Sequence, residues 1–369
     1  MFQSKTYRLA TILLVLLTVA LPSIAQSEKN KKKKGPPTGT PVLWREPVNI
    51  QTRNLLLGAG GEAMRPNLSR ITFIEDKTGG YSKKYRVKDA SGNEWVAKLG
   101  KEAQPDTAAN RLLWAVGYET EIAYLIPRLT IEGKGTFENV RLEARPKSID
   151  RAGDWKWGNN PFTGSPEFQG LKVMMVLINN WDIKDSNNEI LANRNQANGQ
   201  LRYIISDLGG SFGKTGGFLT RSRNKPTDFV KADFIEEIKG NTIDFNYGGK
   251  NKKLFENITV GDARWIGGYL ARLSNEQIKD AFRAANYRPQ EVEGLWRAMR
   301  ERIDALNDAT GQRVSTLTRP RSSSDRNLNT KDEDSSAASR LVAQPKKVGS
   351  YLYRKGRDGV RAVRKVNLP

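Results

Sequence analysis

The stretch NNWDIKDSNNEILANRNQANGQLRYIISDLGG, residues 179–210, decides the fold expected for this chain. Its middle has the pattern of a β-hairpin: strand Glu189–Ala192, a polar turn carrying Asn198-Gly199, and strand Leu201–Ser206. Asn-Gly is typical of tight hairpin turns because both residues tolerate positive φ. The stretch therefore predicts a hairpin with polar residues at both ends.

The register of this hairpin brings an amide beside a carboxylate. If Ala192 pairs with Leu201, then Asn187 lies opposite Ser206 and beside Asp207, where one strand begins and the other ends. Oxygen ligands of this kind, completed by phosphate oxygens and water, are the usual way in which proteins hold Mg²⁺. Asn187 and Asp207 are therefore candidate metal ligands.

A loop and a buried helix are expected before the hairpin. Asp182 stands five residues before Asn187, on a loop facing the same spot, and Lys184 follows it by two residues. Ser165-Pro166 has the features of a helix start, with a capping residue and a proline in the first turn. Residues 171–178 are apolar on nearly all sides, which predicts a helix in the middle of a domain.

The earlier part of the chain is rich in strand patterns. Five short runs have strand patterns: Ile71–Asp76, Tyr85–Ala90, Glu94–Gly100, Tyr124–Ile131 and Val140–Ala144. Turn-forming residues separate the first three. Pro105-Asp106 opens a helix after the third run. In that third run Lys98 has mostly apolar neighbours. It is either an edge-strand lysine that discourages aggregation or a cation that a site requires.

Composition narrows the chemistry that is available. The chain has 369 residues, with 61 Lys+Arg against 40 Asp+Glu, and it contains no histidine and no cysteine. Ser-His and Cys-His nucleophile pairs, zinc sites built on imidazole or thiolate, and disulfides are therefore excluded. An active site must use carboxylates, amides, hydroxyls, lysines, arginines and a hard metal ion, which favours phosphate chemistry.

An ordered set of motifs resembles the protein-kinase-like fold: Val96-Ala97-Lys98, then Asp182-x-Lys184-x-x-Asn187, and Asp207-Leu208-Gly209 after the hairpin. The resemblance covers roughly residues 70–308. It implies an α+β, two-lobed domain over residues 43–309, with a strand-rich N-lobe at about 43–145 and a helical C-lobe at about 146–309. It also implies ATP with Mg²⁺ or Mn²⁺ as cofactors.

The resemblance assigns a role to each matching position. Lys98 would hold the α- and β-phosphates, and Asp182 would orient or deprotonate the acceptor hydroxyl. Lys184 would neutralise the migrating phosphoryl group, and Asn187 and Asp207 would hold the metal ions. A site of this kind needs neither histidine nor cysteine.

Two features match the usual kinase pattern less closely: the phosphate-binding turn and the acidic partner of Lys98. Gly79, Gly80 and Ser82 would form the turn, which has only two glycines. A carboxylate should pair with Lys98; Asp106 at the helix start is the first choice, and the alternatives are Glu102, Glu119 and Glu121.

Other departures point to the atypical kinases, such as phosphoinositide, toxin-type and secretory-pathway kinases. Asn180-Trp181 replaces the His-Arg before the catalytic aspartate, and no Ala-Pro-Glu follows Asp207. Residues 209–215 end in Gly-Lys-Thr as a P-loop would, but Leu208 stands where the first glycine is required. We expect this stretch to be the mobile segment after the metal-binding aspartate.

The end of the domain has helical patterns. Ser274 with Gln277 predicts a capping box, and Pro289 predicts the first turn of another helix with one apolar face. Trp265 and Trp296 are expected in the core rather than as ligand-stacking residues.

The two ends of the chain carry most of the net charge. Residues 1–25 have the pattern of a secretory signal peptide, so the chain is expected to be exported to the periplasm or the outside, with no membrane-spanning segment in the mature chain. Residues 26–42 are a Lys/Pro-rich leader and 310–369 a basic tail, both expected to be disordered. These tails could contact a polyanion.

Two functions from different classes fit this sequence. The first is an exported ATP-dependent phosphotransferase, or a related nucleotidyl transferase, of the kinase-like fold with an unknown acceptor. The second is a catalytically silent pseudokinase that acts as a binding or scaffold module at an anionic surface. A nucleic-acid-binding protein is disfavoured because the positive charge lies mainly in the tails.

Overall fold

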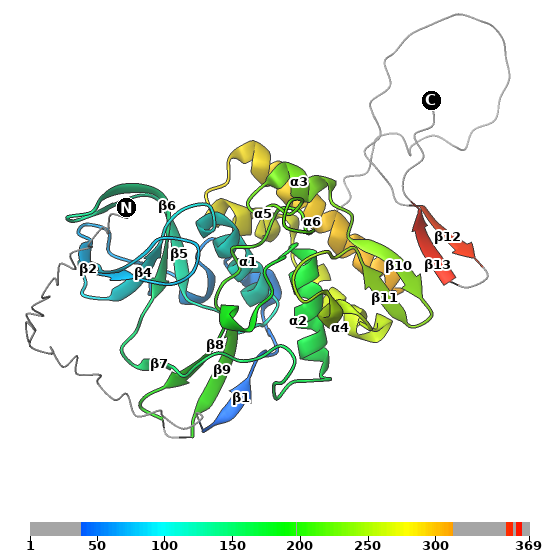
Figure 1. Ribbon diagram of the computed structural model, residues 1–369, viewed down its shortest axis with the longest axis horizontal. Coiled ribbons are helices and arrows are strands. Elements are labelled where there is room, and N and C mark those ends of the chain that lie inside the picture. Colours follow the sequence, from blue (N-terminus) through cyan, green and yellow to red (C-terminus); the bar gives the residue numbers. More distant parts are fainter. Residues whose placement is uncertain (1–37, 197, 313–351, 357–358, 364–369) are drawn as a thin grey trace, which may run out of the picture. The chain divides into compact units, whose positions relative to one another are not determined.

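The computed structural model describes residues 38–196 and 198–312, and the backbone alone of 352–356 and 359–363. One antiparallel sheet has the strand order β2-β3-β4-β6-β5, formed by β2 (Thr72–Lys77), β3 (Lys84–Lys88), β4 (Glu94–Lys98), β6 (Gly135–Ala144) and β5 (Ala123–Ile131) (Figure 1). All five predicted strands are present. β6 begins earlier than expected, because residues 135–138 extend the pairing with β5.

The two faces of this sheet differ in character. One face is apolar and packs in a core of its own, which includes Tyr85, Val87, Trp95, Ala97, Tyr124, Ile126, Val140 and Leu142. Lys98 lies on the opposite face, since side chains alternate along a strand. β4 is the middle strand of five, and Lys98 is 3% exposed. The edge-strand explanation for this lysine is therefore wrong.

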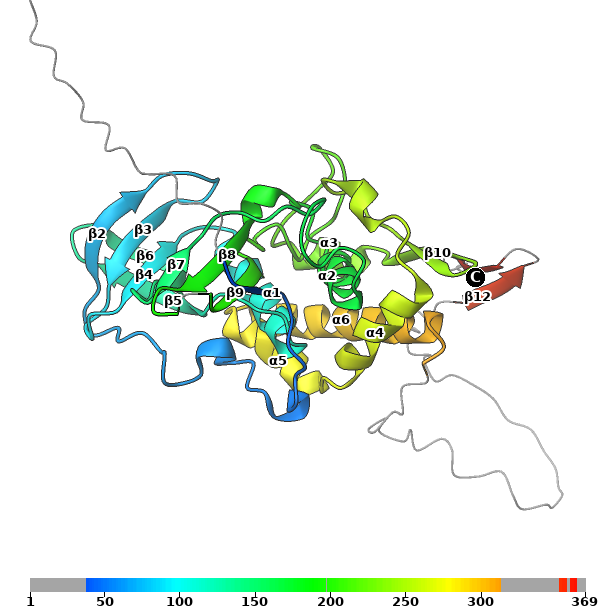
Figure 2. The same cartoon turned by 90° about the horizontal axis from the view of Figure 1, so that it is seen from below.

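The helices gather in the second half of the chain (Figure 2). They are α2 (Pro166–Leu177), α3 (Pro226–Lys231), α4 (Val260–Ala271), α5 (Asn275–Ala284) and α6 (Pro289–Ala309), while α1 (Ala103–Ala115) follows β4. Short 3₁₀ turns occur at Ile50–Thr52, Gly58–Gly60, Asp185–Asn187 and Lys252–Phe255. α2 packs against α4 and α6, as its apolar surface predicts.

Predicted helix caps are confirmed by hydrogen bonds. The hydroxyl of Ser165 accepts the N–H of Phe168, and Ser274 and Gln277 form the reciprocal capping box of α5. Trp265 and Trp296 are partly buried and pack against the core, as expected. No helix among the residues described is long and apolar enough to cross a bilayer.

The hairpin that decides the fold has the predicted register. β8 (Asn188–Asn193) pairs with β9 (Gln200–Ile205), and Ala192 lies opposite Leu201. The N–H groups of Ser206 and Asp207 both donate to the carbonyl of Asn187, at 2.8 and 3.2 Å. The start of one strand and the end of the other are therefore fastened together.

Several short strands were not predicted. β1 (Thr40–Val42) runs parallel to β9, and β7 (Ile149–Arg151) pairs with β8, giving the order β1-β9-β8-β7. Three residues are too few to show a period, so pairing partners alone define these strands. Because residues 40–42 are paired, the end of the leader expected to be disordered over 26–42 is ordered.

The second half of the chain is also less purely helical than expected. β10 (Ile235–Lys239) and β11 (Thr242–Phe245) form a hairpin around Gly240, whose φ is +56°. β12 (Leu352–Gly356) and β13 (Gly359–Val363) extend this sheet from the tail that was expected to be disordered. The rest of that tail, the signal peptide and most of the leader lie outside the described residues. The predicted lobe boundaries stay predictions.

Candidate active site

Lys98 is the centre of a buried cluster of charges. Its Nζ lies 2.8 Å from Oδ1 of Asp207, 3.0 Å from Oδ2 of Asp106 and 3.4 Å from Oε2 of Glu102. β4 carries the lysine, Glu102 is the N-cap residue of α1, Asp106 lies in the first turn of α1, and Asp207 follows β9. The cluster thus joins the sheet, the next helix and the hairpin.

The carboxylates proposed as partners of Lys98 separate into two groups. Asp106, the first choice, and Glu102 both lie within ion-pair distance of it. Glu119 pairs instead with Arg45, and Glu121 with Arg151 at 2.7 Å. The backbone N–H of Leu208 also donates to Oδ1 of Asp106 at 3.4 Å, so this carboxylate contacts both the lysine and the Asp-Leu-Gly segment.

Burial and charge act in opposite directions on this cluster. Burial by itself lowers the pKa of Lys98, but Asp106 and Asp207 outweigh it and the pKa is raised. Burial raises the pKa of Asp207, but the charge and hydrogen bond of Lys98 outweigh it and the pKa is lowered. Both groups are therefore held in their charged forms.

Asn187 and Asp207 offer oxygen atoms to a cation. The amide nitrogen of Asn187 donates to the carbonyl of Asp182 at 2.6 Å, which leaves its amide oxygen to act as an acceptor. In the described part of the chain, no group of three or more acidic side chains is arranged to hold a metal ion. The amide and carboxylate suit a hard cation whose other ligands are phosphate oxygens and water.

Asp182 lies between two lysines. Its Oδ2 is 3.0 Å from Nζ of Lys184 and its Oδ1 is 2.6 Å from Nζ of Lys250. A hydrogen bond within the loop stabilises its conformation, since the N–H of Asp182 donates to Oδ1 of Asn180 at 3.1 Å. Asn180 therefore supports the loop at a position where protein kinases have histidine.

Lys250 was not found by sequence reasoning. Its N–H donates to the carbonyl of Trp181 at 2.9 Å, and Asn251 Nδ2 donates to the carbonyl of Ile183 at 2.9 Å. A Cβ on Gly249 would lie 2.8 Å from Cα of Trp181, so only glycine fits this close approach. No local pattern signals Lys250, because a long-range contact after the unpredicted hairpin β10–β11 brings it to Asp182.

Two arginines of the segment after Asp207 cover the same loop. The guanidinium carbons of Arg221 and Arg223 lie 4.1 and 4.7 Å from the ring centroid of Trp181. Arg223 also forms an ion pair with Glu102. No helix begins at Lys214, as expected for a stretch that is not a P-loop. Sequence reasoning placed this segment but assigned no role to its arginines.

The turn between β2 and β3 lies next to the cluster. Gly79 and Gly80 have φ of +101° and +78°, a conformation that favours glycine. The hydroxyl of Ser82 is buried and donates to Glu102 at 2.6 Å. The structure thus brings the turn to the carboxylate that also contacts Lys98.

This arrangement is a protein-kinase-like fold. A lysine on the third strand of a five-stranded antiparallel sheet pairs with a carboxylate on the following helix, and an Asp-x-Lys-x-x-Asn loop, a hairpin and an Asp-Leu-Gly segment follow. The fold class is α+β, as expected.

Comparisons with known proteins give the following results. No protein-family model matches the chain, and no curated protein matches its sequence. Among solved structures, the Helicobacter pylori proinflammatory kinase CtkA is similar at 13% identity and a TM-score of 0.43, over 67% of this chain and 98% of that one. A Golgi casein kinase is similar at 8% identity and a TM-score of 0.32, over 73% of this chain and 75% of that one. Neither informs the role of any residue here.

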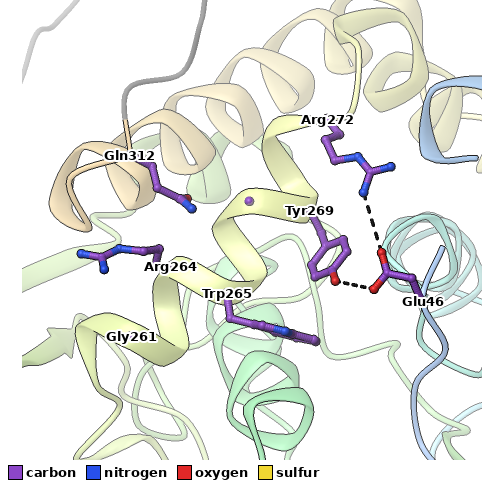
Figure 3. A pocket seen from close by; sticks show the side chains of 8 residues that line it. Glu46, Gly261, Arg264, Trp265, Tyr269, Arg272 and Gln312 are labelled. Atoms are coloured by element: carbon purple, nitrogen blue, oxygen red, sulfur yellow. Dashed lines mark hydrogen bonds and ion pairs between the residues drawn. The ribbon is translucent and has the colours of Figure 1, made fainter. Parts of the chain in front are cut away.

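A separate hollow of about 530 Å³ lies along α4 (Figure 3). Glu46 stands between Tyr269 and Arg272 at its edge, accepting a hydrogen bond from the tyrosine at 2.5 Å. Trp265 and Gln312 also line it. None of the predicted site residues does.

Proposed function

We propose that this chain is an exported ATP-dependent phosphotransferase that transfers the terminal phosphoryl group of Mg-ATP to a hydroxyl of an unidentified acceptor. The observation that carries the proposal is the buried Lys98, held between Asp106 of α1 and Asp207 after β9. Burying a charge costs several kcal/mol in effective terms. A fold would not need this arrangement for packing alone, since apolar residues would stabilise it at least as well.

The residues at the hairpin fit a divalent cation. Asn187 and Asp207 would hold Mg²⁺ or Mn²⁺ through their oxygen atoms. A bound ion of this kind would neutralise the negative charge of the phosphate oxygens. Asp207 is suited to this role because Lys98 keeps it ionised.

The remaining roles belong to the lysines and to Asp182. Lys98 would bind phosphate oxygens, and the turn at Gly79, Gly80 and Ser82 would lie over them. Asp182 would orient the acceptor hydroxyl, and Lys184 would neutralise the migrating group. Each oxygen of Asp182 contacts one ammonium and keeps a lone pair that can accept a hydrogen bond from the acceptor hydroxyl.

Export is supported by sequence alone. Residues 1–25 have a positive start, a short apolar run and small residues before a cleavage site. Expressing the full chain and determining the N-terminus of the protein recovered outside the cytoplasm tests this part. An intact N-terminus on protein found inside the cell would contradict it.

Nucleotide binding is the first test of the activity. Purified protein should be stabilised against thermal unfolding by millimolar ATP with Mg²⁺ or Mn²⁺, and Asp207→Ala should abolish this shift. With γ-labelled ATP, wild type should label itself or an added acceptor, and Asp182→Ala should stop labelling while it spares binding. Binding without any transfer would favour the silent pseudokinase. No stabilisation of wild type would overturn the proposed activity.

A further inference from the structure

Three cations form a row across the sheet. Lys84 on β3 pairs in register with Lys98 on β4, and Lys98 pairs in register with Arg141 on β6. Directly opposed residues of antiparallel strands have their side chains on the same face, with Cβ atoms about 4.5–5.5 Å apart. The three side chains therefore stand together on the face opposite the apolar core.

The members of the row differ in their partners. Lys98 has three carboxylates within 3.4 Å, and Arg141 pairs with Glu143 and lies 3.6 Å from Asp106. No carboxylate among the residues that the structure describes lies within ion-pair distance of the Lys84 ammonium. Within the described part of the chain, Lys84 is therefore the member of the row that has no carboxylate at ion-pair distance.

Lys84 lies next to the glycine turn. A Cβ on Gly80 would be 3.2 Å from Nζ of Lys84, whereas a Cβ on Gly79 would meet no atom within 4 Å. The ammonium therefore lies close to Gly80, and the space beside Gly79 is open. Unlike its neighbour Lys83, Lys84 is half-buried.

The surroundings of Lys84 disfavour a charge. Burial and the nearby charge of Lys98 lower the pKa of Lys84, and the attraction of Asp207, Glu143 and Asp106 does not restore it. Two adjacent ammonium groups repel each other unless anions lie between them. An anionic ligand that spans both lysines would remove this repulsion.

We propose that Lys84 is a second phosphate-binding cation, so that the site takes a polyphosphate spanning Lys98 and Lys84, with Lys84 contacting the phosphate next to the glycine turn. The inference rests on the proposed function and deepens it. It predicts selectivity for a nucleoside triphosphate over a monophosphate. The alternative explanation is a solvated lysine at the start of a strand. Lys83, the exposed residue just before β3, whose ammonium lies 5.1 Å from the ring centroid of Tyr85, is the matched control.

The test compares Lys84→Met with Lys83→Met in the full chain. Affinities for ATP, AMP and inorganic tripolyphosphate, each with Mg²⁺, are measured by calorimetry, and thermal unfolding is followed without ligand. Lys84→Met should bind ATP about tenfold to a hundredfold more weakly, the range of a lost hydrogen bond to a charged group. AMP affinity should stay unchanged, and Lys84→Arg should restore most of the ATP affinity.

The unliganded proteins provide a second readout. Lys84→Met should be at least as stable as wild type, because it removes a repelled charge. A clear loss of stability would overturn the inference, since it would show that Lys84 supports the fold. Equal ATP affinity in Lys84→Met and Lys83→Met, or an equal loss of ATP and AMP affinity in Lys84→Met, would also overturn it.

Failure of the proposed function gives a different result. If wild type binds no nucleotide but binds tripolyphosphate, and Lys84→Met alone loses that binding, the phosphate site stands and the ATP-dependent activity fails. If wild type binds neither ATP nor tripolyphosphate, both are wrong.

Discussion

The two halves of the candidate site use the same kind of ion pair in different surroundings. Around Lys98, the side chains of the lysine and Asp106 are 4% and 1% exposed. Around Asp182, whose own side chain is 16% exposed, the side chains of Lys184 and Lys250 are 41% and 38% exposed. Buried charges depend on their partners for stability, whereas half-exposed ones are solvated and add little. Substitutions around Lys98 should therefore mainly lower the free energy of unfolding, and substitutions around Asp182 should mainly lower the rate of phosphoryl transfer.

Removing the central cation is expected to have the largest effect on folding. Lys98→Met leaves Asp106, Asp207 and Glu102 facing one another, which should cost about 3–5 kcal/mol of unfolding free energy. Urea denaturation measures this loss. Adding Asp106→Asn to the Lys98→Met variant should recover part of the stability, and a further loss in the double variant would contradict the explanation.

The exposed half should show the opposite balance. Asp182→Asn should lower the rate of phosphoryl transfer by about a hundredfold or more, since positioned acid–base groups contribute on this scale. Its unfolding free energy should change by less than about 1 kcal/mol, because its partners are half-exposed lysines. A stability loss as large as that of Lys98→Met would remove the distinction between the two halves.

Lys250 sharpens the comparison within the exposed half. Lys250→Met should lower the rate of transfer by about tenfold, the scale of one lost charged hydrogen bond, and leave ATP affinity unchanged. Lys252→Met, in an exposed lysine two residues further on, is the matched control. Equal rates in the two variants would show that Lys250 has no part in the reaction.

A further expected effect is on how the unfolding free energy changes at acidic pH. Burial would raise the pKa of Glu143, but Arg145 and Arg141 hold it well below its ordinary value. Its contribution to stability is therefore present above the ordinary carboxyl pKa and is lost as the pH falls through the lowered value. Unfolding free energy measured from pH 6 to pH 2 should fall less steeply in Glu143→Gln than in wild type. Parallel slopes would contradict this assignment.

Local patterns predicted the parts of the site that lie close together in sequence. The hairpin followed from the strand pattern and its polar turn; the register assumed for it, Ala192 with Leu201, is the one observed, and it places Asn187 beside Asp207. Short elements such as β1 and β7 escaped prediction because three residues show no period. Lys250 and Arg223 escaped because contacts across the chain bring them to Asp182 and Glu102.

The sequence by itself determined the chemical types at the site. With no histidine or cysteine, only lysines, amides, carboxylates and hydroxyls could act, and their order along the chain indicated a kinase-like arrangement. Only the tertiary structure decided which charges are buried and which are exposed. It placed Lys98 on a central strand among three carboxylates, Asp182 between two lysines, and Lys84 next to the glycine turn. The reason is physical: the strength of an ion pair depends on its partners and on solvent access, and packing sets both.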